Sequence, residues 1–490
     1  MNHRRPALLV QVASPSSFRL IALGLATALT LAACGRDGLF EEELDAADAT
    51  SADTDADTSA DSAGPGTTDA SPGDIVDQEV VEPTDSGQPD GITADTSADA
   101  GPDVEPIEPD TTTGQDTVQP PDTFTVSGVF FAEDRQFGRN GFTGSRVPTS
   151  IPGVLVRLAQ GGDIVCETFA DETGLWTCEL NSELFGVTVD AQVRSQYQLE
   201  HGGELKTTTV LPQRGDGQYE WSSPIELGPD AVYELQIPGD SPANAAAHIL
   251  TVLHTGFVWM ADRDVAFGNR LTIRWTAGRA FDCGSCYSNG TISLGGGLAD
   301  TDEYDDHIIL HELAHHLVAT GSQDSSPGGP HRDRLVEPDL AWSEGHAYAW
   351  AALVADTRFL VDTFADSTRV TDLEQVTVNG VGVPFPASGV HAMTADVREE
   401  WIAALIYDVF DAADTAEPND LLALDQALAG VAFYELALGW NDGNDLVPRG
   451  FDLADWLQLM SCNLRDETRG LSELARANRF DWPGPQDCSR

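Results

Sequence analysis

The sequence His311-Glu312-Leu313-Ala314-His315-His316 lies in a stretch whose composition predicts a helix. On a helix, residues four apart share one face, so His311 and His315 can both direct a ring nitrogen at one point. Glu312 is rotated from them by about 100° and lies beside that point. Two imidazoles with an adjacent carboxylate are typical of a metal site that keeps one position open for water. We therefore expect His311 and His315 to bind a metal ion and Glu312 to act on water beside it.

The residues around this motif support a helix. Acidic side chains, which suit a helix N-terminus, precede it at Asp302, Glu303, Asp305 and Asp306. His307 lies one turn before His311, and we interpret it as a histidine on the helix surface. The alternative is that its side chain contacts and supports one of the metal ligands. The competing interpretation of the whole motif is a surface helix with incidental histidines.

A third ligand is sought downstream, because the extended motif with Gly and His after the second histidine is absent at Val318 and Gly321. The run Ala341–Trp350 predicts another helix, and Glu344 is a lone carboxylate within it. Such a carboxylate is seldom buried without a partner, and a metal ion is a strong partner. His331, in a Gly/Pro/Ser-rich loop, and His346 are the rival ligands.

This pair of motifs resembles the gluzincin superfamily of zinc peptidases, of the thermolysin- and fungalysin-like type. In those enzymes the His-Glu-x-x-His helix is followed by a helix with a Glu ligand, and Ser343-Glu344-Gly345-His346-Ala347 resembles their Asn-Glu-Gly-Phe-Ala segment. The resemblance implies one Zn²⁺ held by His311, His315 and Glu344, with Glu312 as general base in peptide-bond hydrolysis. A peptide or protein is the implied substrate, and it would add to the edge strand predicted at 287–296.

The resemblance also implies a second electrophile for the oxyanion. Gly389-Val390-His391 is similar to the segment that supplies a histidine in thermolysin- and fungalysin-like enzymes, so His391 is the candidate, with Tyr407 as the alternative. Each residue also has an interpretation without a catalytic role: His391 as a loop histidine and Tyr407 as an aromatic side chain of the core. Tyr348 replaces the family's Asp four residues after the Glu ligand. The aminopeptidase Gly-x-Met-Glu-Asn motif is absent, which favours an endopeptidase.

The charge of the chain is strongly negative and uneven. The formal net charge is −54, and Lys206 is the only lysine. Residues 34–122 are rich in Asp, Glu, Ala, Thr, Ser and Pro and contain too few large apolar groups to fold, so we interpret them as a disordered acidic linker. This charge excludes nucleic acid as an expected partner and excludes charge-driven binding to anionic membranes.

The N-terminus predicts export and anchoring. Arg4 and Arg5 precede a short apolar run at 20–30, which is followed by Leu31-Ala32-Ala33-Cys34-Gly35. This end resembles the bacterial lipobox, which implies cleavage of a signal peptide at 1–33 and lipidation of Cys34. The expected location is the bacterial cell envelope, with the lipid bilayer as partner through the acylated cysteine; the outer membrane or cell surface is favoured over the inner membrane.

The other cysteines form an even set in an exported chain and fall into neighbouring pairs. We predict three disulfides, Cys166–Cys178, Cys283–Cys286 and Cys462–Cys488. A redox or half-zinc role for Cys-Gly-Ser-Cys at 283–286 is the alternative to a structural loop beside the site.

The fold class follows from these segments: a multidomain chain with a disordered acidic tether, a small antiparallel β-sandwich and an α+β zincin-like catalytic domain with a helical C-terminal half. Alternating short runs predict the sandwich at 123–238, which resembles carboxypeptidase regulatory-like domains. The catalytic domain is expected at 239–490. The alternative to a peptidase is a non-catalytic surface binding protein that keeps the zinc-peptidase fold.

Overall fold

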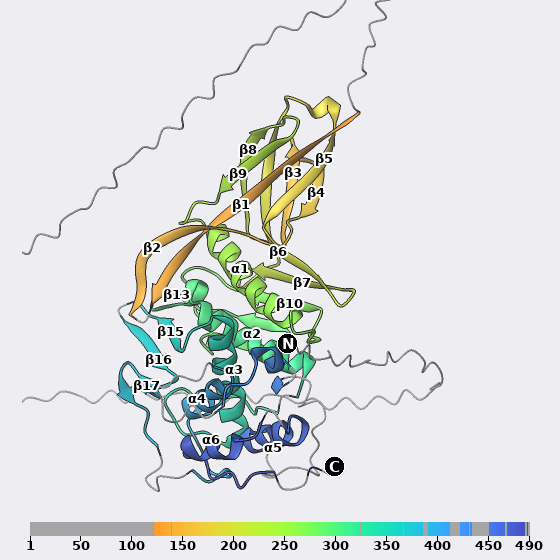
Figure 1. The fold of residues 1–490 in the computed structure, drawn as a ribbon. Helices are drawn as coiled ribbons and strands as arrows, with labels where there is room; N and C mark the ends of the chain where they lie inside the picture. Colours follow the sequence, from red (N-terminus) through yellow and green to blue (C-terminus); the bar gives the residue numbers. More distant parts are fainter. Residues whose placement is uncertain are drawn as a thin grey trace, which may run out of the picture. The chain divides into compact units, whose positions relative to one another are not determined.

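The computed structural model describes residues 122–490 except 139, 324, 366, 386–390, 412–421, 431, 434–449, 466–467, 486–487 and 489–490. All of them belong to one compact unit, Asp110–Arg490 (Figure 1). The predicted signal peptide, Cys34 and nearly all of the acidic linker lie outside the described residues.

The N-terminal part of this unit consists of nine strands in two sheets. One sheet contains β1 and its neighbours, and β1 pairs antiparallel with β2 and β5 but parallel with β9. In the other sheet, β3, β7 and β8 pair antiparallel with β6, and β4 pairs antiparallel with β3. The bounds are β1 Thr123–Gly138, β2 Gly141–Ser150, β3 Val154–Gln160, β4 Asp163–Phe169, β5 Leu175–Asn181, β6 Thr188–His201, β7 Glu204–Leu211, β8 Glu220–Glu226 and β9 Ala231–Gln236.

Alternating burial explains why these segments form strands. Along β5 every second side chain is buried, including Trp176, Cys178 and Leu180, so one face of the strand packs on the core. Trp176 lies against Phe130 of β1. The predicted strands are therefore present, although the parallel β1–β9 pair departs from the expected antiparallel sandwich.

The second sheet does not end at the predicted domain boundary after residue 238. β10 (Arg270–Arg274) pairs parallel with β7, and β12 (Thr291–Ser293) and β11 (Cys286–Ser288) extend the sheet further. The free edge of β7 carries unpaired backbone groups, which β10 satisfies. One eight-stranded sheet therefore links the β-rich segment to the part that carries the histidine motif.

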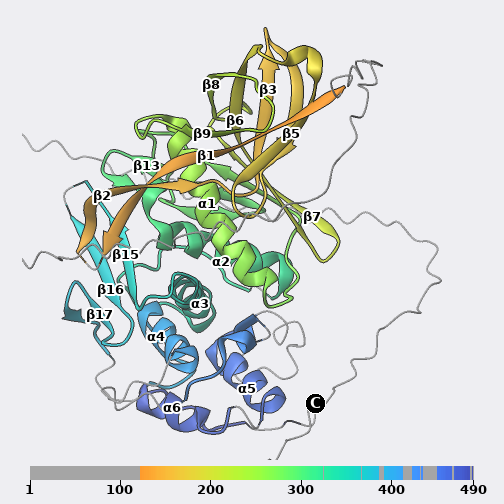
Figure 2. The ribbon, with the colours of Figure 1, turned by 45° about the horizontal axis from the view of Figure 1, so that its top comes forward.

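Helices pack beside this sheet, in the order α1, α2, α3 and α4 (Figure 2). Ser241 caps α1, and a proline occupies its first turn, as helix starts favour. The bounds are α1 Pro242–Ala261, α2 Asp306–Gly321, α3 Pro338–Val354, α4 Glu399–Phe410, α5 Leu453–Asn463 and α6 Leu471–Ala477. The helix predicted around the histidine motif is α2, and the helix predicted at 341–350 lies within α3.

Two glycines allow close helix packing. A Cβ atom on Gly256 of α1 would lie 2.6 Å from Leu313 Cδ2 on α2. A Cβ atom on Gly345 of α3 would lie 2.5 Å from Ile402 Cβ on α4. The first contact fixes the helix that carries His311 against α1, and the second fixes the helix that carries Glu344 against α4.

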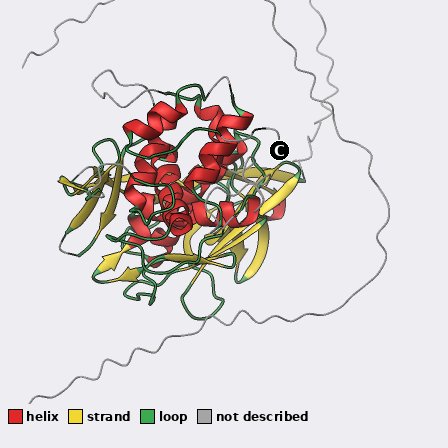
Figure 3. Cartoon of the chain, turned by 90° about the horizontal axis from the view of Figure 1, so that it is seen from below, coloured by secondary structure: helices red, strands yellow, loops and turns green. Residues whose placement is uncertain are grey.

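Short strands complete the described fold. β13 (Gly296–Gly297) and β14 (Asp300–Thr301) form a hairpin, and β15 (Phe359–Thr363), β16 (Thr368–Asp372), β17 (Thr377–Val378) and β18 (Val381–Gly382) form a separate antiparallel sheet. Figure 3 shows the helices grouped together, with strands on two sides of the group. None of the helices in the described part of the chain is long and apolar enough to cross a membrane.

The three predicted disulfides are present. Cys166 is bonded to Cys178, joining β4 to β5, and Cys283 is bonded to Cys286. Cys462 at the end of α5 is bonded to Cys488.

Candidate metal centre

Helix α2 places the two motif histidines together. His311 Nε2 and His315 Nε2 lie 3.2 Å apart, and their rings meet nearly edge to face. The four-residue spacing produces this arrangement directly, because both side chains leave the helix on the same face.

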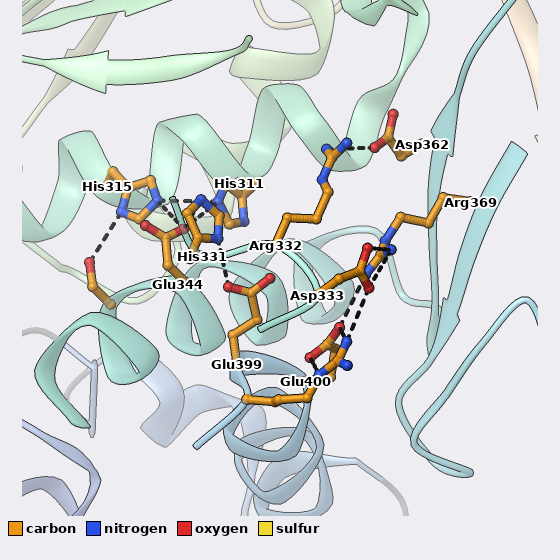
Figure 4. Close-up of polar contacts among 12 residues, drawn as sticks. His311, His315, His331, Arg332, Asp333, Glu344, Asp362, Arg369, Glu399 and Glu400 are labelled. Atoms are coloured by element: carbon orange, nitrogen blue, oxygen red, sulfur yellow. Dashed lines mark hydrogen bonds and ion pairs between the residues drawn. The ribbon is translucent and has the colours of Figure 1, made fainter. Parts of the chain in front are cut away.

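Helix α3 supplies the predicted third group. Glu344 Oε2 lies 3.1 Å from His311 Nε2 and 3.2 Å from His315 Nε2. The three side chains form a group whose potential ligand atoms all lie within 4.8 Å of one another (Figure 4). Ligands at about 2.0–2.1 Å from a tetrahedral zinc ion lie about 3.3–3.4 Å from one another, so this donor set fits such an ion.

Burial sets the protonation of these groups. It lowers the pKa of His311 to about 4, so the imidazole is neutral and keeps a lone pair for a metal. Burial acts to raise the pKa of Glu344, but His315 and His311 together hold it well below its ordinary value. Metal binding requires neutral imidazoles and an ionised carboxylate, and His311 and Glu344 match that requirement.

Glu312 lies in the same cavity without joining the three donors. Its side chain is buried, and among the described residues its Oε2 has no hydrogen-bond partner. Burial raises the pKa of Glu312 to about 7, which is close to the value that suits a general base at neutral pH. The position agrees with the one predicted from its rotation on the helix.

The cavity has a volume of about 760 Å³. Its walls come from the loop that precedes β11, from β14, from α2 and α3, and from the loop that joins these two helices. The lining residues used below are Ser285, Tyr287, Asp300, Asp302, His331, Arg332 and Tyr348.

The disulfide loop forms part of this wall, as expected for a structural loop beside the site. Cys283 and Cys286 both line the cavity. Ser285, between them, donates a hydrogen bond to Asp302 and accepts one from the backbone N–H of Gly295 at 2.9 Å. These contacts fix the loop against the segment that leads into α2.

Two carboxyls in a neighbouring part of the wall, Asp300 and Asp302, group with Asp362. Arg332 pairs with Asp362 at 2.8 Å. Burial and the nearby Asp300 raise the pKa of Asp302 to about 8, so these acids are not all ionised together at neutral pH.

His331, a rival ligand in the sequence, lies in the cavity. It does not join the group of His311 and His315; its ring nitrogens group with Glu344 and Glu399. His331 Nδ1 lies 2.6 Å from Glu399 Oε2, and its Nε2 lies 3.6 Å from Glu344 Oε2. Sequence reasoning missed Glu399 entirely, because the contact joins residues far apart in the chain.

The other rival, His346, lies away from the metal centre. Its ring packs against Trp342 and Phe433. His307 is also not where the sequence placed it. It is buried rather than on the helix surface, with Phe137 against its ring and the Val361 N–H donating to its Nδ1 at 3.2 Å. β1 and β15 cover this face of α2, which a helix pattern alone does not reveal.

The structure does not bring His391 to the cavity. Its backbone N–H donates to the Arg479 carbonyl, its Nε2 lies 3.0 Å from the Asp396 carbonyl, and Phe480 packs on the ring. Pairing with the C-terminal segment removes this histidine from the site, so the geometry does not support the predicted oxyanion role. Gly389 and Val390 lie outside the described residues.

The two tyrosines considered from the sequence have different places. Tyr407 on α4 does not line the cavity, and burial raises its pKa to about 12. This agrees with the core-aromatic interpretation. Tyr348 lines the cavity, and its ring centroid lies 4.4 Å from that of His311. The ring therefore packs on a candidate ligand at the position where the resembling family has an acid.

One comparison with known protein families gives a match. A sequence model described as the mycolysin C-terminal domain matches residues 255–437. A search of curated proteins finds no match to the chain. The matched segment contains α2, α3 and α4 and therefore all of the candidate metal-binding side chains. This segment is therefore similar to a domain of a peptidase family.

Proposed function

We propose that the protein is a zinc-dependent peptidase that hydrolyses peptide bonds with Glu312 as general base. The observation that carries this proposal is the group of His311, His315 and Glu344, with donor atoms 3.1–3.2 Å apart and Glu312 buried next to them. A purely structural zinc site has four protein ligands and no use for such a carboxylate, whereas a catalytic site keeps a position open.

The three ligands and Glu312 would have different roles in the reaction. Zinc, held by His311, His315 and Glu344, would lower the pKa of water and polarise the substrate carbonyl. Glu312 would take a proton as the water oxygen attacks the carbonyl carbon. It would then pass this proton to the amine when the C–N bond breaks.

The substrate would be a peptide or protein, and endopeptidase action is favoured. The chain lacks the motif that anchors a free amine in the resembling aminopeptidases. β11 and β12 occupy the place of the predicted edge strand, and Tyr287 of β11 lines the cavity. An extended peptide could add to this edge through its backbone.

Metal dependence tests this proposal. The full chain would be purified, its zinc content measured, and cleavage of casein and a peptide library followed before and after treatment with a chelator. We expect about one zinc ion per chain, loss of hydrolysis on chelation and recovery when zinc is added. Wild-type protein with a full zinc content and no hydrolysis would contradict the peptidase and favour a surface binding protein.

We also propose that acylated Cys34 anchors the protein to the bacterial cell envelope. The support is the sequence Leu31-Ala32-Ala33-Cys34 at the end of an apolar run, followed by an acidic tract suited to a tether. In a bacterial host that processes lipoproteins, Cys34→Ser should move the protein from the membrane fraction to the soluble fraction. A variant that stays in the membrane fraction would exclude this anchor.

A further inference from the structure

The second half of β1 lies against α1, the helix that packs beside α2 (Figure 2). Asn244 of α1 accepts a hydrogen bond from the Glu133 N–H at 2.6 Å and donates one to the Glu133 carbonyl at 3.0 Å. Its amide also donates to the Tyr304 hydroxyl at 3.0 Å. One buried side chain therefore joins β1, α1 and the turn that precedes α2.

His248, one turn further along α1, is buried with hydrogen-bond acceptors at both ring nitrogens. Its Nδ1 lies 3.0 Å from the Glu303 carbonyl oxygen. Its Nε2 lies 3.1 Å from Asp134 Oδ1 on β1 and 3.4 Å from Asp306 Oδ1 on α2. Because a carbonyl and an ionised carboxylate only accept hydrogen bonds, each ring nitrogen must carry a hydrogen. The contacts therefore define a buried imidazolium between a carboxylate of β1 and a carboxylate of α2.

The charges around this ring agree with that protonation. Burial acts to lower the pKa of His248, but Asp134 and Asp306 together raise it above its ordinary value. Burial raises the pKa of Asp306 to about 6, so this carboxyl is ionised in the pH range where His248 would lose its proton. The other charged or titratable groups at the ring, from β1 and the turn before α2, are Arg135, Glu303 and Tyr304.

This ion group holds the helix that carries the metal-binding histidines. Asp306 is the first residue of α2, five residues and therefore about 7.5 Å along the helix axis before His311. Phe137 of β1 also packs on His307, with ring centroids 5.3 Å apart. Since α2 is a continuous helix, a shift of its first turn against β1 also moves His311 and His315.

We propose that His248 is a positioning residue whose imidazolium, held by Asp134 and Asp306, fixes α2 against β1. Through α2 it places His311 and His315 for the metal ion. A buried ion group adds little stability over apolar side chains, but it can fix one arrangement of the elements that it joins. The effect on hydrolysis rests on the proposed function, whereas the effect on zinc binding needs only the metal site.

The role of the proton gives this inference a definite pH dependence. The ion group is complete below pH 6.5 and is lost as the pH rises through the raised pKa of His248 in the folded protein. Asp134→Asn removes one of the two carboxylates that raise this pKa, so the loss should occur at lower pH. His248→Gln has no proton to lose at this position.

Competitive zinc titrations from pH 6.5 to about 9 would test the role without any need for hydrolysis. At pH 6.5 we expect the wild type to bind zinc about tenfold more tightly than His248→Gln, the scale on which groups that orient metal ligands act. This ratio should fall towards one as the pH rises. On a peptide that the wild type cleaves, kcat of His248→Gln should be about 10–100-fold lower, as for a misplacement of about 1 Å.

His254→Gln is the matched control on the same helix. Its Nδ1 lies 2.9 Å from the Tyr197 hydroxyl on β6, so it contacts the sheet rather than α2. Its zinc affinity should follow that of the wild type at each pH. If His248→Gln does not fold, Asp134→Asn still tests the role, because its zinc affinity should fall at lower pH than that of the wild type.

The outcomes separate this inference from the proposed function. Equal zinc affinity in the wild type and folded His248→Gln at pH 6.5 would refute the role of His248. A difference that is independent of pH, with no shift in Asp134→Asn, would mean that the ring acts by packing alone and would also refute it. A zinc-loaded wild type that hydrolyses no peptide would refute the peptidase and leave the result of the zinc titrations standing.

Discussion

Adding one methyl group at Gly345 should separate the two helices that build the metal centre. A Cβ atom there would lie 2.5 Å from Ile402 Cβ, 2.7 Å from Ile402 Cγ2 and 2.8 Å from the Glu399 carbonyl oxygen. Carbon atoms in favourable contact lie about 3.5–4.0 Å apart, so α3 and α4 must move by about 1 Å. Neither the Cβ nor the carbonyl can rotate away.

The expected cost follows from two opposing effects. Overpacking of this kind costs about 1–3 kcal/mol. Alanine is better than glycine within a helix by about 1 kcal/mol, which offsets part of it. We expect Gly345→Ala to lower the free energy of unfolding by up to about 2 kcal/mol. Zinc affinity and kcat should fall as well, because Gly345 is next to Glu344 in the chain. A Cβ atom on Gly345 would also displace Glu399, whose side chain contacts His331 in the cavity.

Urea unfolding of the zinc-loaded protein and a competitive zinc titration would measure both effects. Gly382→Ala is the control, because a Cβ atom there meets nothing within 4 Å. Its unfolding free energy should change by less than about 0.5 kcal/mol. A Gly345→Ala variant that is as stable as the wild type and binds zinc equally well would refute the close contact between α3 and α4.

Two further predictions concern the ligand and the buried histidine. Glu344→Ala should lose zinc on dialysis, as measured by metal analysis, whereas a stoichiometric zinc content would show that another residue is the third ligand. Burial lowers the pKa of His307 from 6.5 to about 4. Between these two pH values the unfolded chain binds more protons than the folded chain. The free energy of unfolding therefore falls as the pH falls through this window. His307 contributes at most about 3 kcal/mol to the change in unfolding free energy over this window. His307→Gln should therefore flatten the dependence of unfolding free energy on pH. Equal slopes of this dependence in the variant and the wild type would contradict the prediction.

Local spacing explains why part of the site could be predicted. His311 and His315 meet because four residues make about one helical turn, and this geometry needs no tertiary information. Glu344 could be found because a carboxylate in an apolar helix requires a partner. Both inferences use features that a short segment contains by itself.

The features that sequence reasoning missed depend on long-range contacts. His391 is held by the C-terminal segment near Phe480, and Glu399 reaches His331 across a large separation in the chain. The alternation of apolar and polar residues predicted the strands, but not the order in which they pair. The parallel pairing of β10 with β7, which joins the expected domains into one sheet, follows from the fold as a whole.

The most direct test of the account compares wild type and Glu312→Gln on the same peptide, with zinc measured in the same samples. The substitution replaces the carboxylate by an amide of almost the same shape and leaves the donor set of His311, His315 and Glu344 intact. We predict about one zinc ion in both proteins and a kcat at least roughly 10²-fold lower in the variant, the scale of general-base catalysis. Equal rates at equal zinc content would contradict the assignment of Glu312 as the base.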